Sequence, residues 1–179
     1  MRTRQLAPAA VLIAAVAWPA AALAQASPPA TASATIGGKR ITIRYSAPSV
    51  RGRKIFGDGG LLSRDPTYPV WRAGANAATT LQTEADLQMG NLAVPKGTYT
   101  LYVLVRDPNA WQLIINKQTG QWGLSYDARQ DLGRVPMAMS KPPALVETLK
   151  YTFTDHGGGR GELRLEWENH AGAVPITVR

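Results

Sequence analysis

Three arginines, an asparagine and a tryptophan are the side chains of this sequence best suited to hold a ligand. Arg51 and Arg53 lie two positions apart in "RGRK", Arg72 and Asn76 lie in "WRAGAN", and Trp122 lies in "GQWG". In extended backbone, Arg51 and Arg53 point to the same side and form a fork for a carboxylate or phosphate. Asn76 offers both a donor and an acceptor. Together with Trp122 as a stacking platform, these residues predict a site for a carbohydrate or a small anion.

The same residues also suit a structural role, and the sequence leaves the two roles open. Gly74 and Asn76 are natural turn residues before the strand expected at 78–83. Arg72 has the donors to clamp backbone carbonyls of a long loop. In extended backbone Trp71 points away from Arg72, so we expect Trp71 to anchor this segment in the core.

The residue types required for several kinds of catalysis are missing or badly spaced. The chain has no cysteine, which excludes thiol nucleophiles and thiolate metal sites. No serine lies in a G-x-S-x-G or S-x-x-K arrangement, and the glycine runs lack a Walker lysine. His156 and His170 lie in expected surface turns without a metal-binding spacing. We therefore predict no metal site and no cofactor.

Paired carboxylates leave one route to an enzyme. Asp127 or Asp131 is the candidate base of a hydrolase or lyase, with the arginines stabilising developing negative charge. Local ion pairing with Arg129 is the competing interpretation of Asp127. Glu166 and Glu168 alternate with apolar residues, so we expect both on the solvent face of a strand.

The elements that must position these residues are strands, because apolar residues recur with a period of two. The alternating runs are Ile41–Tyr45, Leu149–Phe153, Leu163–Trp167 and Val174–Val178. Two further runs, Thr98–Val105 and Trp111–Asn116, are apolar on both faces, as expected of central strands. This pattern predicts an all-β fold: a single antiparallel β-sandwich or jelly-roll-like domain of about eight to ten strands. The segment Ser46–Ala77 is far longer than an ordinary connection. Its apolar content predicts that this one long loop packs on the sandwich.

The N-terminus has the pattern of an export signal. Residues 1–24 combine Arg2 and Arg4 with an apolar run and small residues at Ala22 and Ala24, which predicts a signal peptide cleaved after Ala24. Residues 25–34 are expected to be a flexible lead-in and residues 35–179 the β-sandwich domain. The protein is then periplasmic or secreted, without stable membrane insertion after cleavage.

Five segments together resemble a known family. They are "YSAPSVRGRKIFG", "VWRAGANAATT", "PKGTYTLYVL", "WQLIINKQTGQWG" and "ELRLEWE", and they cover about Thr35 to Val178 in this order. The chain is similar to the domain of unknown function 2911 family, exported bacterial proteins of unassigned activity. The resemblance leads us to expect an arginine and a glutamate where this chain has Ala47 and Ala77. It implies a compartment but no reaction.

The net charge of +8 favours anionic partners, but the basic residues are scattered and match no nucleic-acid-binding motif. Nucleic acid is therefore not an expected partner. The sequence favours a non-catalytic module that binds a carbohydrate or a small anionic cell-envelope ligand. Two alternatives stay open: a hydrolase or lyase acting on cell-envelope material, and a structural or interaction module that uses an exposed sheet edge.

Overall fold

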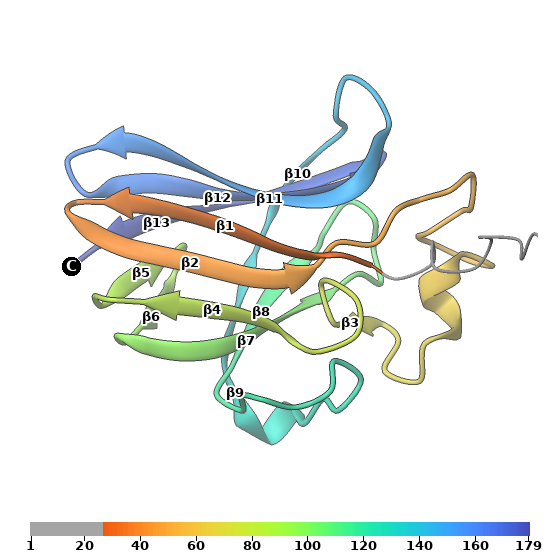
Figure 1. Ribbon diagram of the computed structural model, residues 1–179, viewed down its shortest axis with the longest axis horizontal. Helices are drawn as coiled ribbons and strands as arrows, with labels where there is room; N and C mark the ends of the chain where they lie inside the picture. The colour runs from red at the N-terminus through yellow and green to blue at the C-terminus, as the bar shows by residue number, and fades with distance from the viewer. Residues whose placement is uncertain (1–26) are drawn as a thin grey trace, which may run out of the picture.

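Two antiparallel β-sheets packed face to face make up the protein in a computed structural model, which describes residues 27–179 (Figure 1). The first sheet has seven strands, ordered β1-β2-β4-β7-β8-β9 with β3 paired to β7. The second has six, ordered β11-β12-β13-β5-β6 with β10 paired to β13. The predicted all-β sandwich is confirmed. The predicted signal peptide lies outside the described residues.

The thirteen strands follow one another with two short 3₁₀ helices between them. Their bounds are β1 Pro29–Ile36, β2 Lys39–Ser46, η1 Leu61–Arg64, β3 Val70–Trp71, β4 Thr79–Thr83, β5 Leu87–Met89, β6 Leu92–Val94, β7 Gly97–Leu104, β8 Gln112–Asn116, η2 Ala128–Gln130, β9 Asp131–Pro136, β10 Ala138–Ser140, β11 Val146–Gly157, β12 Arg160–Glu168 and β13 His170–Val178. No helix among residues 27–179 is long and apolar enough to cross a membrane.

The core lies between the sheets and is built from the alternating apolar residues of the central strands. Leu101 and Val103 of β7 and Leu163 and Leu165 of β12 have no exposed surface. Because successive side chains of a strand point to opposite faces, this alternation places every second residue in the core. All seven predicted strands, including the one expected at 78–83, are present, as β2, β4, β7, β8, β11, β12 and β13.

The N-terminal strand corrects the predicted flexible lead-in at residues 25–34. Strand β1 begins at Pro29 and pairs with β2 along its whole length, through a turn at Gly37 and Gly38. Both glycines have positive φ, 56° and 74°, as a two-residue hairpin turn between twisted strands requires. The small residues of β1 hide its alternation, and the Gly-Gly pair is the signal that identifies the hairpin.

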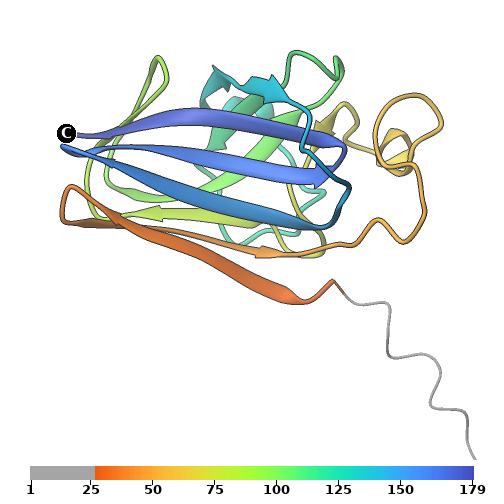
Figure 2. The ribbon, with the colours of Figure 1, turned by 90° about the horizontal axis from the view of Figure 1, so that it is seen from above.

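Segments that pass from one sheet to the other close the sandwich (Figure 2). Strands β9 and β10 form an almost continuous run, in which β9 pairs in the first sheet and β10 in the second. After β2, the chain bridges to β11: Ser49 pairs with Thr148, and Leu149 donates its N–H to the carbonyl of Pro48. The edge strand β1 also lies beside the edge strand β11. These contacts cover the edges of β1 and β11.

The long loop after β2 is held by an aromatic cluster at one end of the sandwich. Its centre is Phe56, whose ring centroid lies 4.7–5.8 Å from those of Trp71, Trp111, Trp167 and His170. Phe56 and Trp71 belong to the loop segment, whereas the other three belong to the sandwich. The expectations that the loop packs down and that Trp71 anchors it in the core are confirmed, since Trp71 is 1% exposed.

Replacing the central ring of this cluster should destabilise the protein strongly. Phe56→Ala is expected to lower the free energy of unfolding by about 3–5 kcal/mol, the usual cost of removing a buried phenylalanine. Chemical denaturation measures this loss. Trp122→Ala is the matched control, because Trp122 is 55% exposed and its removal should cost no more than about 0.5 kcal/mol. Equal losses in both variants would show that the loop does not depend on the cluster.

Candidate functional site

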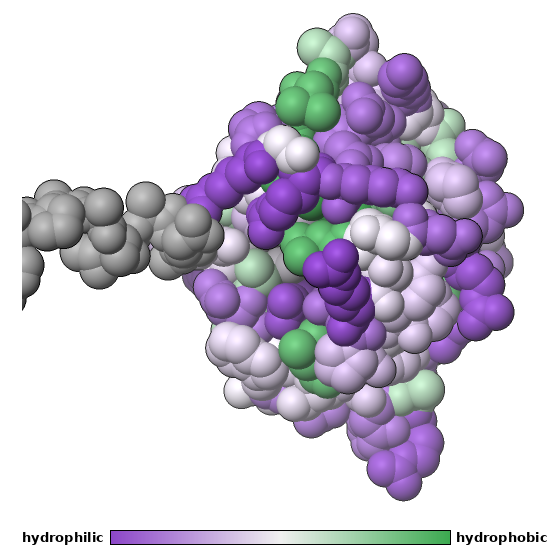
Figure 3. All heavy atoms as spheres, turned by 90° about the vertical axis from the view of Figure 1, so that its right-hand side faces the viewer, coloured by the Kyte–Doolittle hydropathy of each residue, from purple (hydrophilic) through white to green (hydrophobic). Residues whose placement is uncertain are grey.

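A pocket of about 250 Å³ opens at the end of the sandwich that carries the long loop. Figure 3 faces this end, where hydrophobic atoms are visible between hydrophilic side chains. The pocket lies between the loop, the N-terminal approach to β1 and the end of β12. Its lining residues are Ser27, Pro28, Ala47, Pro48, Ser49, Arg51, Arg53, Leu61, Leu62, Asp65, Arg72, Gly74, Ala75, Asn76 and Trp167. Four of the five predicted ligand-binding residues therefore meet here: Arg51, Arg53, Arg72 and Asn76.

Arg51 and Arg53 reach the pocket from a tight turn and not from the predicted extended segment. The N–H of Arg53 donates to the carbonyl of Val50 at 3.1 Å, and Arg51 and Gly52 have φ of 52° and 67°. Positive φ at both central residues defines a type I′-like turn, so the expected fork of parallel side chains is wrong. Glu147 holds the turn on β11 by accepting the backbone N–H of Arg51 at 2.8 Å.

Arg53 acts as a clamp within this turn. Its Nε donates to the carbonyl of Val50 at 2.9 Å and its Nη2 to the carbonyl of Ser49 at 2.6 Å. These two bonds use much of the guanidinium to fix the backbone that forms the pocket wall. The clamping role considered for the arginines therefore describes Arg53.

The segment after Trp71 turns sharply, and this turn places Arg72 in the pocket. Ala73 has φ of 51°, a conformation that is costly for a residue with a Cβ. Its carbonyl is held by the Tyr151 hydroxyl at 2.7 Å and by the Thr79 hydroxyl at 3.1 Å. Gly74 follows because a Cβ there would lie 2.5 Å from Oγ1 of Thr79. As predicted, Trp71 enters the core while Arg72 points the other way.

Trp122 is the predicted site residue that the structure leaves outside the pocket lining. Its side chain is 55% exposed, and its backbone pairs with Ala77. The next residue, Gly123, donates its N–H to the carbonyl of Asn76 at 3.0 Å. A Cβ on Gly123 would lie 2.6 Å from Cδ of Arg72. The "GQWG" loop therefore supports the stem of Arg72, with Trp122 at the surface beside the site.

Arg72 faces Asp65, a pocket residue that the sequence analysis did not identify. The Nη2 of Arg72 lies 4.0 Å from Oδ2 of Asp65, beyond hydrogen-bond length, and both side chains are about one-fifth exposed. Among residues 27–179, neither Nε of Arg72 nor Oδ2 of Asp65 has a hydrogen-bond partner. Burial raises the pKa of Asp65, against the lowering effect of Arg72. In the sequence, "RDP" suggests only a turn, so only the fold reveals this carboxylate.

Trp167 is the second pocket residue that the sequence analysis did not identify as part of a site. It closes the alternating run of β12, and this pattern indicates a core residue. The residue is 1% exposed and stacks on Trp71 at 5.5 Å, yet it also lines the pocket. Its indole Nε1 has no hydrogen-bond partner among residues 27–179. The pocket therefore adjoins two donors and one acceptor that are buried and unpartnered.

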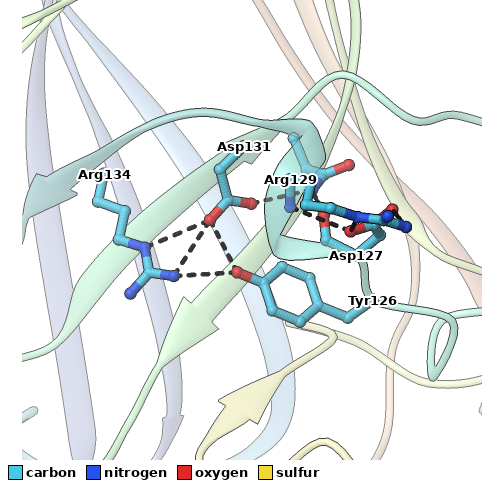
Figure 4. Close-up of polar contacts among 6 residues, drawn as sticks. Tyr126, Asp127, Arg129, Asp131 and Arg134 are labelled. Carbon is cyan, nitrogen blue, oxygen red and sulfur yellow. Dashed lines mark hydrogen bonds and ion pairs between the residues drawn. The ribbon is translucent and has the colours of Figure 1, made fainter.

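The candidate bases Asp127 and Asp131 lie outside the pocket, in a separate network beside β9 (Figure 4). Asp131 accepts from the Tyr126 hydroxyl at 2.7 Å and from Arg134 Nη2 at 3.1 Å. Burial, followed by the hydrogen bond and charge of Asp131, raises the pKa of Tyr126 to about 12. Asp127 caps η2 and pairs with Arg129 at 2.9 Å. Both carboxylates thus have structural partners, as local ion pairing predicts.

Two expectations about β12 and β13 are wrong. Glu166 and Glu168 are each only 8% exposed and are not the solvated residues expected; Lys150 and Arg164 pair with Glu166 at 3.0 Å and 3.4 Å. Glu168 accepts the backbone N–H of Ile55 at 2.8 Å and so tethers the long loop. His170 stacks on Trp111 at 5.4 Å, and its Nδ1 lies 3.2 Å from Glu168 without hydrogen-bond alignment. His156 is exposed as expected, but it lies in β11 next to the turn at Gly158 and Gly159.

A metal ion has no ready-made site in the described part of the chain. No group of three or more histidine, aspartate or glutamate side chains within residues 27–179 is arranged to hold one. The pocket itself contributes a single carboxylate and three guanidinium groups, a set that suits an oxyanion and not a cation.

Comparison with known proteins identifies a family but no activity. A family model described as "Protein of unknown function (DUF2911)" matches residues 27–176. A search of curated proteins and a search of solved structures each gave no match.

The clamp formed by Arg53 should contribute to stability. Arg53→Ala removes two hydrogen bonds to the loop backbone and is expected to lower the free energy of unfolding by about 1–3 kcal/mol, at roughly 0.5–1.5 kcal/mol for each bond. Chemical denaturation measures the change. Arg64→Ala is the control on the same loop, because Arg64 is exposed and has no ion pair or side-chain hydrogen bond among residues 27–179. A loss in Arg64→Ala as large as in Arg53→Ala would contradict the clamp.

Asp65 should cost the folded protein stability at neutral pH. Because its pKa is raised above the ordinary value of 3.8, the folded state binds its proton more tightly than the unfolded chain, and this contribution to stability is lost as pH rises past that value. Asp65→Asn should therefore raise the free energy of unfolding more at pH 7 than at pH 3. Denaturant titrations at both values measure this difference.

Asp127→Asn is the control of opposite sign. Hydrogen bonds from Arg129 lower the pKa of Asp127, so its ionised form stabilises the fold, and this contribution is lost as pH falls. Asp127→Asn should be less stable than the wild type at pH 7, with a smaller difference at pH 3. If both variants changed the free energy of unfolding in the same direction at pH 7, the proposed difference between the environments of Asp65 and Asp127 would be wrong.

Proposed function

Because the chain belongs to the DUF2911 family, whose function is unknown, we propose a function from the geometry of its pocket: the protein binds a small anionic ligand there, with Arg72 as the central contact. The observation that carries the proposal is the state of Arg72. Its side chain is about four-fifths buried, it lines the pocket, and its Nε has no hydrogen-bond partner among residues 27–179. A buried donor without a partner is costly, and a ligand oxygen would satisfy it.

The charges around the pocket support the choice of an anion. Arg51, Arg53 and Arg72 line it together with one carboxylate, Asp65. Guanidinium groups favour carboxylates and phosphates because their fixed donors match the oxygens of these groups. The pocket volume of about 250 Å³ lies below the roughly 300–1,000 Å³ of sites for drug-sized ligands. The proposed ligand is therefore small.

The place of binding follows from the export pattern of residues 1–24. We propose that the protein acts in the periplasm or outside the cell, where the ligand is a component or a fragment of the cell envelope. Asn76, with φ of 59° at the pocket rim, contributes a further polar side chain, and Arg53 keeps the turn in place.

Catalysis is the second candidate, and Asp65 is the observation that favours it. It is the single carboxylate among the described lining residues, and burial raises its pKa. A carboxylate with a raised pKa beside a guanidinium is an arrangement that accepts a proton while negative charge develops nearby. A hydrolase or lyase at this pocket would therefore use Asp65 as its base, in place of Asp127 or Asp131.

Arg72→Gln tests the binding function. Isothermal titration calorimetry with citrate, inorganic phosphate and D-glucuronate should show at least one ligand of the wild-type protein. Its affinity should fall at least tenfold in Arg72→Gln, because a hydrogen bond to a charged group contributes about 1.5–3 kcal/mol. The melting temperature should change by less than about 4 °C, which corresponds to roughly 1 kcal/mol for a domain of this size.

Arg129→Gln is the matched control, because the Arg129 side chain is 88% exposed and lies outside the pocket. It should bind as tightly as the wild type. Undiminished binding in Arg72→Gln would disprove the assigned role of Arg72. A large loss of stability in Arg72→Gln, with none of the three probes binding the wild type, would show that Arg72 holds the loop.

A further inference from the structure

The residues that line the pocket include buried hydrogen-bond donors and a buried acceptor whose hydrogen bonds are not satisfied within the protein. Nε of Arg72 and the indole Nε1 of Trp167 are buried donors without a hydrogen-bond partner among residues 27–179. Oδ2 of Asp65, which forms a 4.0 Å ion pair with Arg72, is a buried acceptor that also lacks a hydrogen bond there. Eight buried side-chain atoms among residues 27–179 lack a hydrogen-bond partner, and three of them belong to residues that line this one small pocket. Native structures satisfy nearly all buried polar groups, so this concentration points to a molecule that supplies the missing partners. That molecule must both accept and donate hydrogen bonds.

A lone carboxylate meets only half of this requirement. Its oxygens accept from Arg72 and Trp167, but it has no proton to give to Asp65, and the two negative charges repel each other. A ligand hydroxyl resolves the conflict, because its proton is donated to Oδ2 of Asp65. A phosphate dianion would be repelled more strongly by Asp65 than a carboxylate, which carries a single charge.

An ammonium group would also donate to Asp65, but the surrounding charge disfavours it. Three guanidinium groups, those of Arg51, Arg53 and Arg72, line the pocket against one carboxylate. A zwitterionic ligand would place its positive charge among these like charges, whereas a neutral hydroxyl carries no such cost. The charges that line the pocket therefore favour a neutral donor such as an alcohol.

Apolar surface completes the description of the ligand. Leu61 and Leu62 line the pocket beside Trp167, so one side of the ligand meets carbon atoms. The volume of about 250 Å³ suits a single ring with its substituents. We propose that the pocket binds a sugar acid, whose carboxylate lies against Arg72, whose hydroxyl donates to Asp65, and whose C–H face contacts the two leucines. This inference rests on the proposed anion-binding function and names its ligand class.

Three probes separate the contributions of the carboxylate and the hydroxyls in calorimetric titrations. D-Glucuronate carries both, propionate carries only the carboxylate, and D-glucose carries only the hydroxyls. The wild-type protein should bind D-glucuronate at least about tenfold more tightly than either of the others, because each missing group leaves a buried partner unsatisfied.

Asp65→Asn gives the decisive comparison. It should weaken D-glucuronate binding about tenfold, since the hydroxyl loses a charged acceptor, and it should strengthen propionate binding, since a repulsive charge is gone. A purely structural role for Asp65 would move both affinities in the same direction. Asp127→Asn, outside the pocket, should leave both affinities unchanged. Asp65→Ala repeats the test without any side-chain acceptor.

The outcomes separate this inference from the proposed function. Equal wild-type affinities for D-glucuronate and propionate, both lost in Arg72→Gln, would overturn the sugar-acid assignment and leave anion binding intact. Absence of binding by every anionic probe would overturn both. A titration with trigalacturonate distinguishes the source of the sugar acid. If the trimer binds more tightly than the monomer, and this gain is lost in Trp122→Ala, the ligand is the end of a polymer. If the trimer binds no more tightly than the monomer, the ligand is a free monosaccharide.

Discussion

The aromatic cluster around Phe56 is the contact on which the rest of this end of the molecule depends. Phe56 and Trp71 come from the loop segment and pack against Trp111, Trp167 and His170 of the sandwich. The burial of several large rings at once compensates for the entropy lost when so long a connection becomes ordered. Because Trp167 also lines the pocket, the contact that fixes the loop also builds the wall of the candidate site.

The polar residues of the loop divide into those that hold the backbone and those that remain available. Arg53 spends its donors on the carbonyls of Ser49 and Val50, and Glu168 accepts from Ile55. Arg72 and Asp65 make no comparable bond, although both are largely buried. The left-handed backbone at Ala73, whose carbonyl accepts a hydrogen bond from Tyr151, turns the chain so that Arg72 lines the pocket. Strained backbone and unpartnered buried groups occur together here, a combination typical of functional sites.

Much of the fold follows from the sequence because the period-two pattern of strands such as Leu163–Trp167 is a direct consequence of strand geometry. Strand β1 could not be predicted from this pattern, since its alanines and threonines differ too little in hydropathy to show an alternation. Its strand conformation depends on pairing with β2. The prediction that Glu166 and Glu168 are exposed to solvent is wrong for a related reason. The pattern predicts which way a side chain points, but not whether another segment or side chain covers that face. The loop and the Lys150 side chain supply the partners that allow these carboxylates to be buried.

The sequence by itself determined the all-β class, the packed loop, the family resemblance and the residue types available for binding: arginines without a cysteine or a metal-ligand spacing. These are local properties, readable from periodicity and composition. Only the tertiary structure decided which side chains share a pocket, because that depends on contacts between residues distant in the chain. It brought Arg51, Arg53, Arg72 and Asn76 together and added Asp65 and Trp167. It left Trp122 at the surface, since the backbone of its loop, and not its ring, meets the site.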